Sequence, residues 1–319
     1  PRHRPLGIDQ LTFCGQLPIA MTCHLKEHEF VYGKLETVAP GIRRLTARNP
    51  SAFTFHGTGT YVIGQGQVAV IDPGPLDADH IQALVEGLSA ETVTHILVTH
   101  CHLDHSPAAR ELKSHTGALT YGFGPHGEMT KGESEPVEEG ADLDFVPDVR
   151  CAHGDVINGL GWRAECVHTS GHTSTHLRFA LDNPSALFTG DHIMAWSTTV
   201  VIPPDGNMTD YITSLKKLTR RTEPTYWPTH GPPLREPLPY VHSLIRHRQE
   251  RIQQIIQQLT RTPQTVPELV ATLYQGLDTR LTGAAGRSTL ASLIHLHYLG
   301  KVSCDSQPDL NSQFTLTHP

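Results

Sequence analysis

The chain has 319 residues and a formal net charge of -7, and 38% of its residues are hydrophobic and 18% charged. These values exclude a disordered or collagen-like chain, and the length is enough for about two globular domains. The negative charge excludes a general electrostatic attraction to nucleic acids or anionic membranes, so such a partner would require a local basic patch.

The first predicted elements are a hairpin, a helix and a strand. Residues 58–74 predict a β-hairpin, because two β-rich runs meet at a Gly-Gln-Gly turn. A helix is expected over residues 77–88 and an apolar strand over residues 95–99. Pro107 then begins another helix, so the histidine-rich stretch before it lies in a loop that directly follows a strand.

Three later strands each end at a residue that can bind a metal ion. The stretches RAECVHTSGHTS, ALFTGDHI and PTYWPTHGPP predict strands that run into turns. The residues that follow these strands are His172, Asp191 and His230. Because loops at the edge of a sheet commonly carry functional side chains, we expect these residues to converge at one site.

The sequence pattern changes after Leu238, where helices replace strands. A long helix is expected over residues 241–259, and Thr265 with Glu268 forms a capping box that begins a second helix. A third helix is expected over residues 284–299, and the runs KVSCD and SQFTLTH can pair as a β-wing. Helices followed by such a hairpin are typical of a winged-helix domain.

The stretch LVTHCHLDHSP, residues 97–107, crowds three histidines and an aspartate together. Imidazole and carboxylate groups are natural ligands of zinc and similar divalent ions. Alternation along the loop lets His100 and His102 face one ion while Asp104 and His105 turn towards a second. A hydrated surface loop is the alternative in a chain with 22 histidines, but the further candidates at strand ends favour a metal site.

This constellation resembles the metallo-β-lactamase superfamily, whose HxHxDH signature is present at residues 100–105. The resemblance extends over about residues 40–236 and implies an α/β fold, the four-layer αββα sandwich of that superfamily. It implies that one metal ion is held by His100, His102 and His172, and a second by Asp104, His105 and His230. Asp191 would bridge both ions, and Asp72 and His176 would lie behind the ligands and orient them.

A closer resemblance covers nearly the whole chain and includes the C-terminal helices. It rests on the stretches NPSAFTFHGTGTYVIG, SGHTSTH, GDHIMAWSTTVV and PPDG and on the tail RHRQERIQQIIQQL. The chain is similar to a β-lactamase-like group of bacterial metal-dependent hydrolases with an appended winged-helix domain, whose relatives include glyoxalase II, lactonases and a mitochondrial endoribonuclease. Ser170 replaces the usual proline of a Thr-Pro-Gly-His turn, which loosens the turn without removing a ligand.

The resemblance also predicts how the chain divides. Residues 1–237 are expected to form the catalytic domain, with residues 1–40 as an N-terminal extension. Residues 238–319 are expected to form the winged-helix domain. That domain is expected to shape the substrate entrance or to form the contact of a homodimer.

The resemblance implies a hydrolase with two divalent metal ions, with zinc as the expected metal and iron or manganese as alternatives. A hydroxide that bridges both ions would attack an ester, thioester, lactone or phosphoester of a small molecule. Asp104 would ligate the second ion and orient this nucleophile. The proton for the leaving group could come from Asp104, from His192 or from a metal-bound water.

Two other functions are open from the sequence, a single-strand-specific endoribonuclease and a metal-responsive winged-helix regulator. A nucleic-acid reader normally shows a basic stripe. The expected recognition helix, AAGRSTLASLIHLHYL, offers only Arg287 for such a stripe. A small-molecule substrate is therefore favoured over a nucleic-acid partner.

Cysteine usage and hydropathy predict a cytoplasmic protein with no membrane partner. The six cysteines contain no CxxC pair, which indicates reduced thiols rather than a disulfide framework. Gly15, Gln16 and Pro18 interrupt the N-terminal apolar run, so it is a poor signal peptide. The sequence also contains no run of about 18 apolar residues that could span a bilayer.

Overall fold

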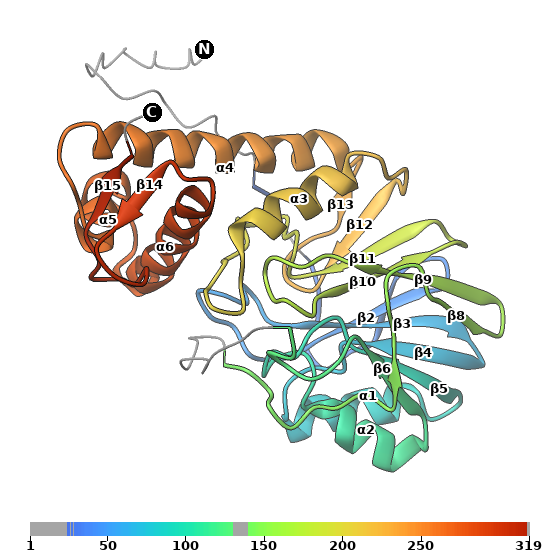
Figure 1. The fold of residues 1–319 in the computed structure, drawn as a ribbon. Helices are drawn as coiled ribbons and strands as arrows, with labels where there is room; N and C mark the ends of the chain where they lie inside the picture. The colour runs from blue at the N-terminus through green and yellow to red at the C-terminus, as the bar shows by residue number, and fades with distance from the viewer. Residues whose placement is uncertain (1–23, 26, 28, 130–139, 318–319) are drawn as a thin grey trace, which may run out of the picture.

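The computed structural model describes residues 24–25, 27, 29–129 and 140–317. These residues form two large β-sheets that pack face to face, with helices on both outer faces and a helical C-terminal part beside them (Figure 1). No helix among them is long and apolar enough to cross a membrane. The predictions for Gly15, Gln16 and Pro18, and for the thiols of Cys14 and Cys23, fall outside the described residues.

The first sheet follows the order of the chain from β1 to β7. Its strands are β1 (Glu36–Ala39), β2 (Ile42–Thr46), β3 (Gly59–Gln65), β4 (Gln67–Ile71), β5 (Thr92–Leu97), β6 (Leu119–Gly122) and β7 (Val149–Arg150). Strands β1 to β4 pair antiparallel, which confirms the hairpin predicted at residues 58–74. Strands β4 to β7 pair parallel. Strand β1 lies within the predicted N-terminal extension, so part of that extension completes the edge of the sheet.

Two helices connect the parallel strands of the first sheet. Helix α1 (Ala78–Gly87) follows β4, and helix α2 (Ala108–Thr116) follows β5. The side chain of Asp77 caps α1 by accepting the backbone N–H of His80 at 2.8 Å, which places the start of the helix where the sequence predicts it. The loop between β5 and α2 carries the histidine-rich stretch, as predicted.

The second sheet has the spatial order β13-β12-β11-β10-β9-β8. Its strands are β8 (Val156–Gly159), β9 (Trp162–His168), β10 (Leu177–Leu181), β11 (Ala186–Gly190), β12 (Thr225–Pro228) and β13 (Leu234–Arg235). Strands β11 and β12 are parallel because helix α3 (Met208–Leu218) crosses between them. Strands β9, β11 and β12 confirm the three strands predicted to precede metal-binding residues.

Alternating side chains on the strands create the layers of the fold. On β3, Tyr61 points into the apolar layer between the sheets, whereas Val62 packs in the layer formed with α1 and α2. On β11, Phe188 faces the same central layer, whereas Leu187 packs in the layer that contains α3. The result is a helix, sheet, sheet, helix arrangement, which confirms the predicted four-layer αββα sandwich (Figure 1).

The described C-terminal residues form helices and a small hairpin in the predicted order. The elements are α4 (Leu238–Leu259), α5 (Val266–Leu273), the short 3-10 helix η1 (Thr279–Leu281), α6 (Thr282–Tyr298), β14 (Val302–Cys304) and β15 (Phe314–Leu316). Strands β14 and β15 pair antiparallel as the wing. Glu268 Oε2 accepts the backbone N–H of Thr265 at 2.7 Å at the start of α5, where the sequence predicts a capping box. We propose that the C-terminal domain begins at Leu238 with α4.

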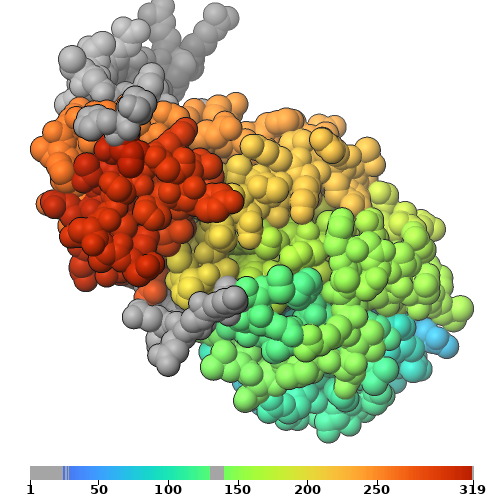
Figure 2. All heavy atoms as spheres, in the orientation of Figure 1, coloured from blue at the N-terminus to red at the C-terminus, as the bar shows by residue number. Residues whose placement is uncertain are grey.

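Helices α4 and α6 hold this C-terminal part against the sandwich. Arg248 of α4 is buried and donates a hydrogen bond from Nη2 to the backbone carbonyl of Thr199. On α6, Nδ1 of His295 lies 2.7 Å from Oγ1 of Thr209, at the start of α3. In the space-filling view, the C-terminal part (red) lies directly against the segment that leads into α3 (yellow) (Figure 2). The two parts therefore share an interface that reaches residues 199–209.

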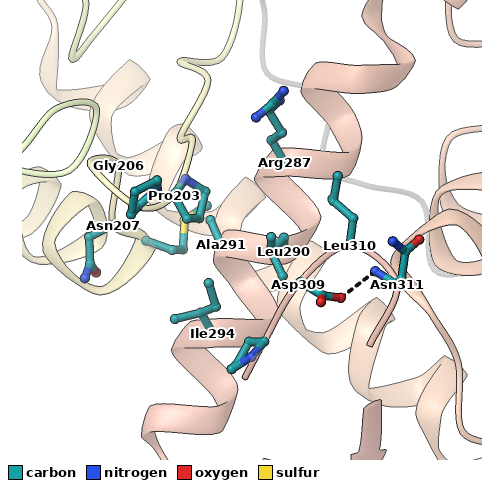
Figure 3. A pocket seen from close by; sticks show the side chains of 13 residues that line it. Pro203, Gly206, Asn207, Arg287, Leu290, Ala291, Ile294, Asp309, Leu310 and Asn311 are labelled. Carbon is teal, nitrogen blue, oxygen red and sulfur yellow. Dashed lines mark hydrogen bonds between the residues drawn. The ribbon is translucent and has the colours of Figure 1, made fainter. Parts of the chain in front are cut away.

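A cavity of about 670 Å³ lies between the sandwich and α6 (Figure 3). Pro203 and Asn207 line it on the side of the sandwich, and Leu290 and Ile294 line it on the side of α6. The C-terminal part thus forms one wall of this cavity, which lies beside the loop that precedes α3.

Candidate metal centre

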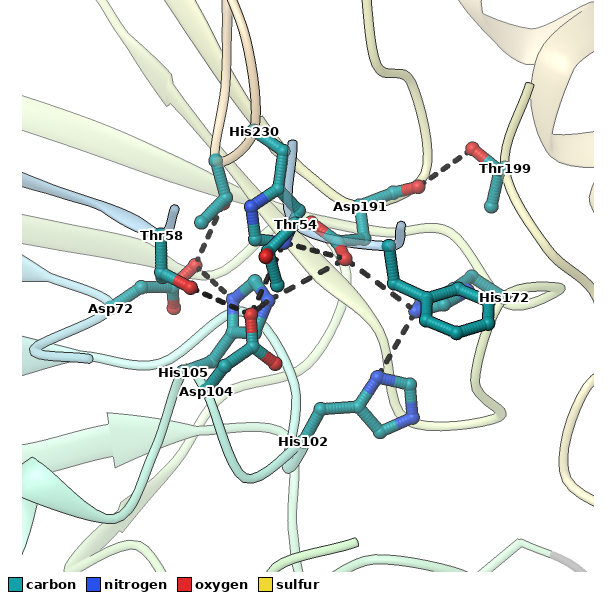
Figure 4. Close-up of polar contacts among 12 residues, drawn as sticks. Thr54, Thr58, Asp72, His102, Asp104, His105, His172, Asp191, Thr199 and His230 are labelled. Atoms are coloured by element: carbon teal, nitrogen blue, oxygen red, sulfur yellow. Dashed lines mark hydrogen bonds and ion pairs between the residues drawn. The ribbon is translucent and has the colours of Figure 1, made fainter. Parts of the chain in front are cut away.

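The structure brings together all of the residues predicted to bind metal ions. Figure 4 labels all of them except His100. They are His100, His102, Asp104, His105, His172, Asp191 and His230. They lie in the loops that follow β5, β9, β11 and β12, so strands of both sheets position them. This convergence of distant segments is what the strand-end pattern predicts.

Three histidines form the first group of potential ligands. His102 Nδ1 lies 3.0 Å from His100 Nε2 and 3.2 Å from His172 Nε2. Zinc binds imidazole nitrogen at about 2.0–2.1 Å with tetrahedral geometry, which requires nitrogen atoms about 3.3 Å apart. The observed spacing therefore matches three nitrogen ligands that share one ion.

A second group surrounds the Asp104 carboxylate. Oδ2 of Asp104 lies 3.3 Å from His105 Nε2 and 3.2 Å from His230 Nε2. Oδ2 of Asp191 lies 3.5 Å from His105 Nε2, 3.3 Å from His230 Nε2 and 3.9 Å from His172 Nε2. Asp191 therefore faces both groups at once, which is the position required of a carboxylate that bridges two ions.

Unpaired polar atoms show that this site suits a divalent cation. His105 Nε2 and Asp191 Oδ1 are buried and make no hydrogen bond within the described residues. His105 Nε2 has only the ion-pair contacts to Asp104 and Asp191, and Asp191 Oδ1 has no polar partner among the described residues, so a cation would supply the pairing that buried polar atoms normally have. Imidazole nitrogens and carboxylate oxygens together are the ligands that zinc, iron and manganese accept in proteins. The residues of this site therefore fit divalent metal ions.

The pKa values of the histidines differ between the first and the second group of potential ligands. Burial, reinforced by neighbouring imidazoles, holds the pKa of His100 and of His102 well below its usual range. Burial also disfavours a charged His230, but the nearby Asp191 and Asp104 carboxylates outweigh it and raise the pKa of His230 to about 10. The second group thus holds protons that a bound cation would replace, whereas the histidines of the first group are held in the neutral form.

Asp72 lies behind His105, as predicted for a residue that orients a ligand. Its Oδ2 lies 3.0 Å from His105 Nδ1, on the ring edge opposite the ligand atom Nε2. Its carboxylate also accepts hydrogen bonds from the backbone N–H of Thr99 at 2.7 Å and from the Thr99 hydroxyl at 2.8 Å. This arrangement fixes both the tautomer and the orientation of His105.

Replacing Asp72 with asparagine is expected to weaken metal binding by about 10- to 100-fold. The amide retains one acceptor oxygen but places N–H donors where His105 and Thr99 already donate, so the His105 ring is no longer held. Competition with a chromogenic chelator measures the affinity. The matched control is Asp79→Asn on the exposed first turn of α1, which leaves the ligands untouched. Equal affinity in the two variants would contradict the role assigned to Asp72.

Other groups that orient the ligands escape sequence reasoning. His172 Nδ1 lies 2.8 Å from the backbone carbonyl of Val200, and His230 Nδ1 lies 3.1 Å from that of Gly57. The Thr58 hydroxyl donates to Asp104 Oδ2 at 2.7 Å, and the Thr199 hydroxyl donates to the Asp191 carbonyl at 2.7 Å. Every residue has a backbone carbonyl, so the sequence does not show which of them will orient a ligand. A threonine in a loop is too common to indicate such a role.

His176 and His192 have different positions. His176 Nε2 accepts the backbone N–H of Asp191 at 3.3 Å, and its ring lies 5.0 Å from that of His100, so it stands behind the ligands as expected. His192 is not brought to the cluster. Its ring is fully buried and stacks on Tyr211 of α3 at 4.6 Å. A ring with no exposed edge has no route to a substrate, so the structure gives no support to His192 as a proton donor.

Comparison with known proteins agrees with this architecture. Residues 54–230 match the family model described as "Metallo-beta-lactamase superfamily", and residues 265–309 match "Beta-lactamase associated winged helix domain". "Lactamase-like protein adaB" of Aspergillus niger is 26% identical over 90% of this chain and 89% of its own length. "Atrochrysone carboxyl ACP thioesterase" of Passalora fulva is 29% identical over 75% of this chain and 70% of its own length.

A solved structure shows the same fold over nearly the whole chain. The crystal structure of a β-lactamase domain protein from Burkholderia ambifaria aligns with a TM-score of 0.75 and 20% sequence identity. The alignment covers 91% of this chain and 96% of that one. The sandwich and the C-terminal helices thus recur together in a protein of low sequence identity.

Proposed function

The chain belongs to the metallo-β-lactamase superfamily of hydrolases, and from this premise we propose that it uses two divalent metal ions to cleave a thioester or ester of a small molecule. The observation that carries the proposal is the position of Asp191. Its Oδ2 lies within 3.9 Å of His172 in the first group and of His105 and His230 in the second. A single carboxylate oxygen shared in this way supports a centre with two ions rather than one.

Two ions held here would lower the pKa of a bound water and so supply a hydroxide nucleophile near neutral pH. The residues of the chain supply the orientation. The Thr58 hydroxyl fixes Asp104, and Asp104 has its other carboxylate oxygen left to orient the nucleophile. The buried carbonyls that hold His172 and His230 keep the ligand rings from rotating, so the site is organised before a substrate arrives.

The substrate class is proposed from the relatives and from the surface of α6. A thioesterase is among the curated relatives, and hydroxide attacks the carbonyl carbon of thioesters, esters and lactones alike. A nucleic-acid substrate would require a basic surface. The described residues of α6 include Arg287, which lines the cavity of Figure 3, and most of the remaining helix is buried. The nuclease is therefore kept as an outcome of the test below.

A substrate panel on metal-loaded protein tests the proposal. The panel contains an acyl thioester, a p-nitrophenyl ester, a lactone, an aryl phosphodiester and single-stranded RNA. Each is assayed with the parent protein, with His100→Ala and with the control His153→Ala, which removes an exposed histidine. Thioester or ester hydrolysis that is lost in His100→Ala and kept in His153→Ala is expected, with two zinc ions per chain by elemental analysis.

Two results would contradict the proposal in different ways. RNA cleavage that depends on His100, without ester or thioester cleavage, would overturn the substrate class and leave the site intact. Equal hydrolysis in the parent and in His100→Ala would overturn the site itself.

A further inference from the structure

A second histidine and carboxylate lie side by side next to the metal centre. His126 follows β6, and Asp205 lies in the loop that precedes α3. Nδ1 of His126 lies 3.8 Å from Oδ2 of Asp205, and the two side chains are only 4% and 7% exposed. Neither of these two atoms makes a hydrogen bond within the described residues. Neither residue is among the predicted ligands, so the pair has no part in the function derived above.

The loop that carries Asp205 is built to hold the carboxylate inward. The Ser174 hydroxyl donates to Oδ1 of Asp205 at 2.5 Å, and the backbone N–H of Gly206 donates to the carbonyl of Ile202 at 2.7 Å. A Cβ at Gly206 would lie 2.4 Å from the Ile202 nitrogen and 3.0 Å from the carbonyl oxygen of His172, so the turn packs tightly against a ligand loop. The packing of this turn and the hydrogen bond from Ser174 therefore keep the Asp205 carboxylate buried.

His126 lies beside both this carboxylate and the first group of ligands. Its ring centroid lies 6.4 Å from that of His102, whose Nδ1 is a potential ligand atom. Only Nδ1 of the His126 ring is sealed from solvent; Nε2 remains accessible and makes no hydrogen bond to a described residue. The ring thus presents one nitrogen to Asp205 and leaves the other without a partner among the described residues, beside the first group of ligands.

A carboxylate oxygen can only accept a hydrogen bond, so Nδ1 is the nitrogen of neutral His126 that carries hydrogen when the two meet. Nε2 then offers a lone pair. The separation of 3.8 Å is too long for a hydrogen bond, but such contacts are often long before a substrate binds. Two buried polar atoms without partners are costly, and a small rotation of the ring would pair them.

We infer that His126, oriented by Asp205, positions the substrate by accepting a hydrogen bond at Nε2. The substrate of the proposed hydrolase is accordingly a thioester or ester that carries an amide N–H or a hydroxyl near the scissile carbonyl. His126 acts here as a specificity-determining residue, and Asp205 as the residue that positions it. The inference rests on the proposed function, because it names the class of substrate for that same site.

Three thioesters with the same chain length test the inference. One carries an amide N–H on the thiol side, one carries a hydroxyl on the acyl side, and one carries neither. The parent protein is expected to prefer at least one of the donor-bearing thioesters in kcat/KM by about 10- to 100-fold. His126→Leu and Asp205→Asn are each expected to bring this ratio towards one. In Asp205→Asn the amide can donate to Nδ1, which reverses the tautomer and turns Nε2 into a donor.

Two further measurements separate recognition from folding. Calorimetry with the non-hydrolysable thioether analogue of the preferred substrate should show the same loss in affinity, with the metal content unchanged. His126→Gln, which keeps an acceptor oxygen, should restore part of the preference. The control His115→Leu, on the exposed surface of α2, should keep the full ratio.

The outcomes distinguish this inference from the proposed function. If the parent protein hydrolyses all three thioesters at equal kcat/KM, or if His126→Leu keeps the parent's ratio, the inference fails while the hydrolase stands. If the parent protein hydrolyses none of these thioesters and no ester of the substrate panel, the proposed function fails; equal binding of the thioether analogue by the parent and by His126→Leu would then also overturn the inference. An equal loss on all three substrates in His126→Leu would also overturn the inference, because it would show an effect on the ligands and not on recognition.

Discussion

Replacing Asp191 with asparagine is expected to lower the rate of hydrolysis by about 10³-fold and to reduce the bound metal from two ions towards one. The Oδ2 atom of Asp191 lies within 3.9 Å of ligand nitrogens from both groups. An amide keeps a similar shape but removes the negative charge that holds two cations close together. The charge stabilisation supplied by a metal centre amounts to several kcal/mol, and each 1.36 kcal/mol corresponds to about tenfold in rate.

Elemental analysis and hydrolysis of the best substrate measure this effect together. The matched control is Asp182→Asn, which makes the same chemical change on a carboxylate that is 53% exposed and paired with Arg163. Asp182→Asn should keep both metal ions and the full rate. If Asp191→Asn also retained two ions per chain and turned over at the parental rate, the shared carboxylate would not be a bridge.

Replacing Gly171 with alanine is expected to destabilise the fold by about 3 kcal/mol and to disturb the ligand next to it. Gly171 has a φ of +139°, and a Cβ there would lie 2.3 Å from Cα and 2.5 Å from the backbone nitrogen of Tyr211. The carbonyl of Gly171 also accepts the N–H of Asn207, the residue that caps α3. A methyl group would therefore force α3 away from the loop that carries His172.

Urea denaturation of the variant measures this loss, and metal analysis shows whether His172 is displaced. Gly161→Ala is the control, because Gly161 also has a positive φ, of +79°, but has open space around the new methyl group. The free energy of unfolding of that variant should fall only by the cost of placing alanine at a positive φ, about 1 kcal/mol. If both variants lost the same free energy of unfolding, the close approach of Tyr211 would not matter.

The sequence predicts which potential ligands come together, because each of them follows a strand at a recognisable motif. Strands with alternating apolar residues can be located from their periodicity, and the loops that follow them then fall at one edge of the sheets. Strand β10 and helix α3 were not predicted. The run Leu177–Leu181 is short and buried on both faces, so it shows no alternation. Helix α3 does carry a readable signal, because Asn207 caps it and its buried apolar residues recur at helical spacing.

The position of His192 away from the cluster and the absence of His126 from the predicted residues have separate physical causes. His192 follows Asp191 in the sequence, which suggests a shared role, but successive side chains after a strand point to opposite sides, and His192 points under α3. His126 and Asp205 lie 79 positions apart, in turns rich in glycine and proline. Their proximity depends on the packing of the two sheets, which no local pattern encodes.

The contact between Arg248 and Thr199 links the C-terminal helices to the candidate metal centre. Arg248 belongs to α4 and holds the carbonyl of Thr199, while the Thr199 hydroxyl holds the carbonyl of Asp191. Two hydrogen bonds thus connect the C-terminal helices to the backbone of Asp191, the residue that carries the shared carboxylate. A change in α4 that breaks the contact of Arg248 would therefore loosen the backbone that positions this carboxylate, although Arg248 lies far from it in the sequence.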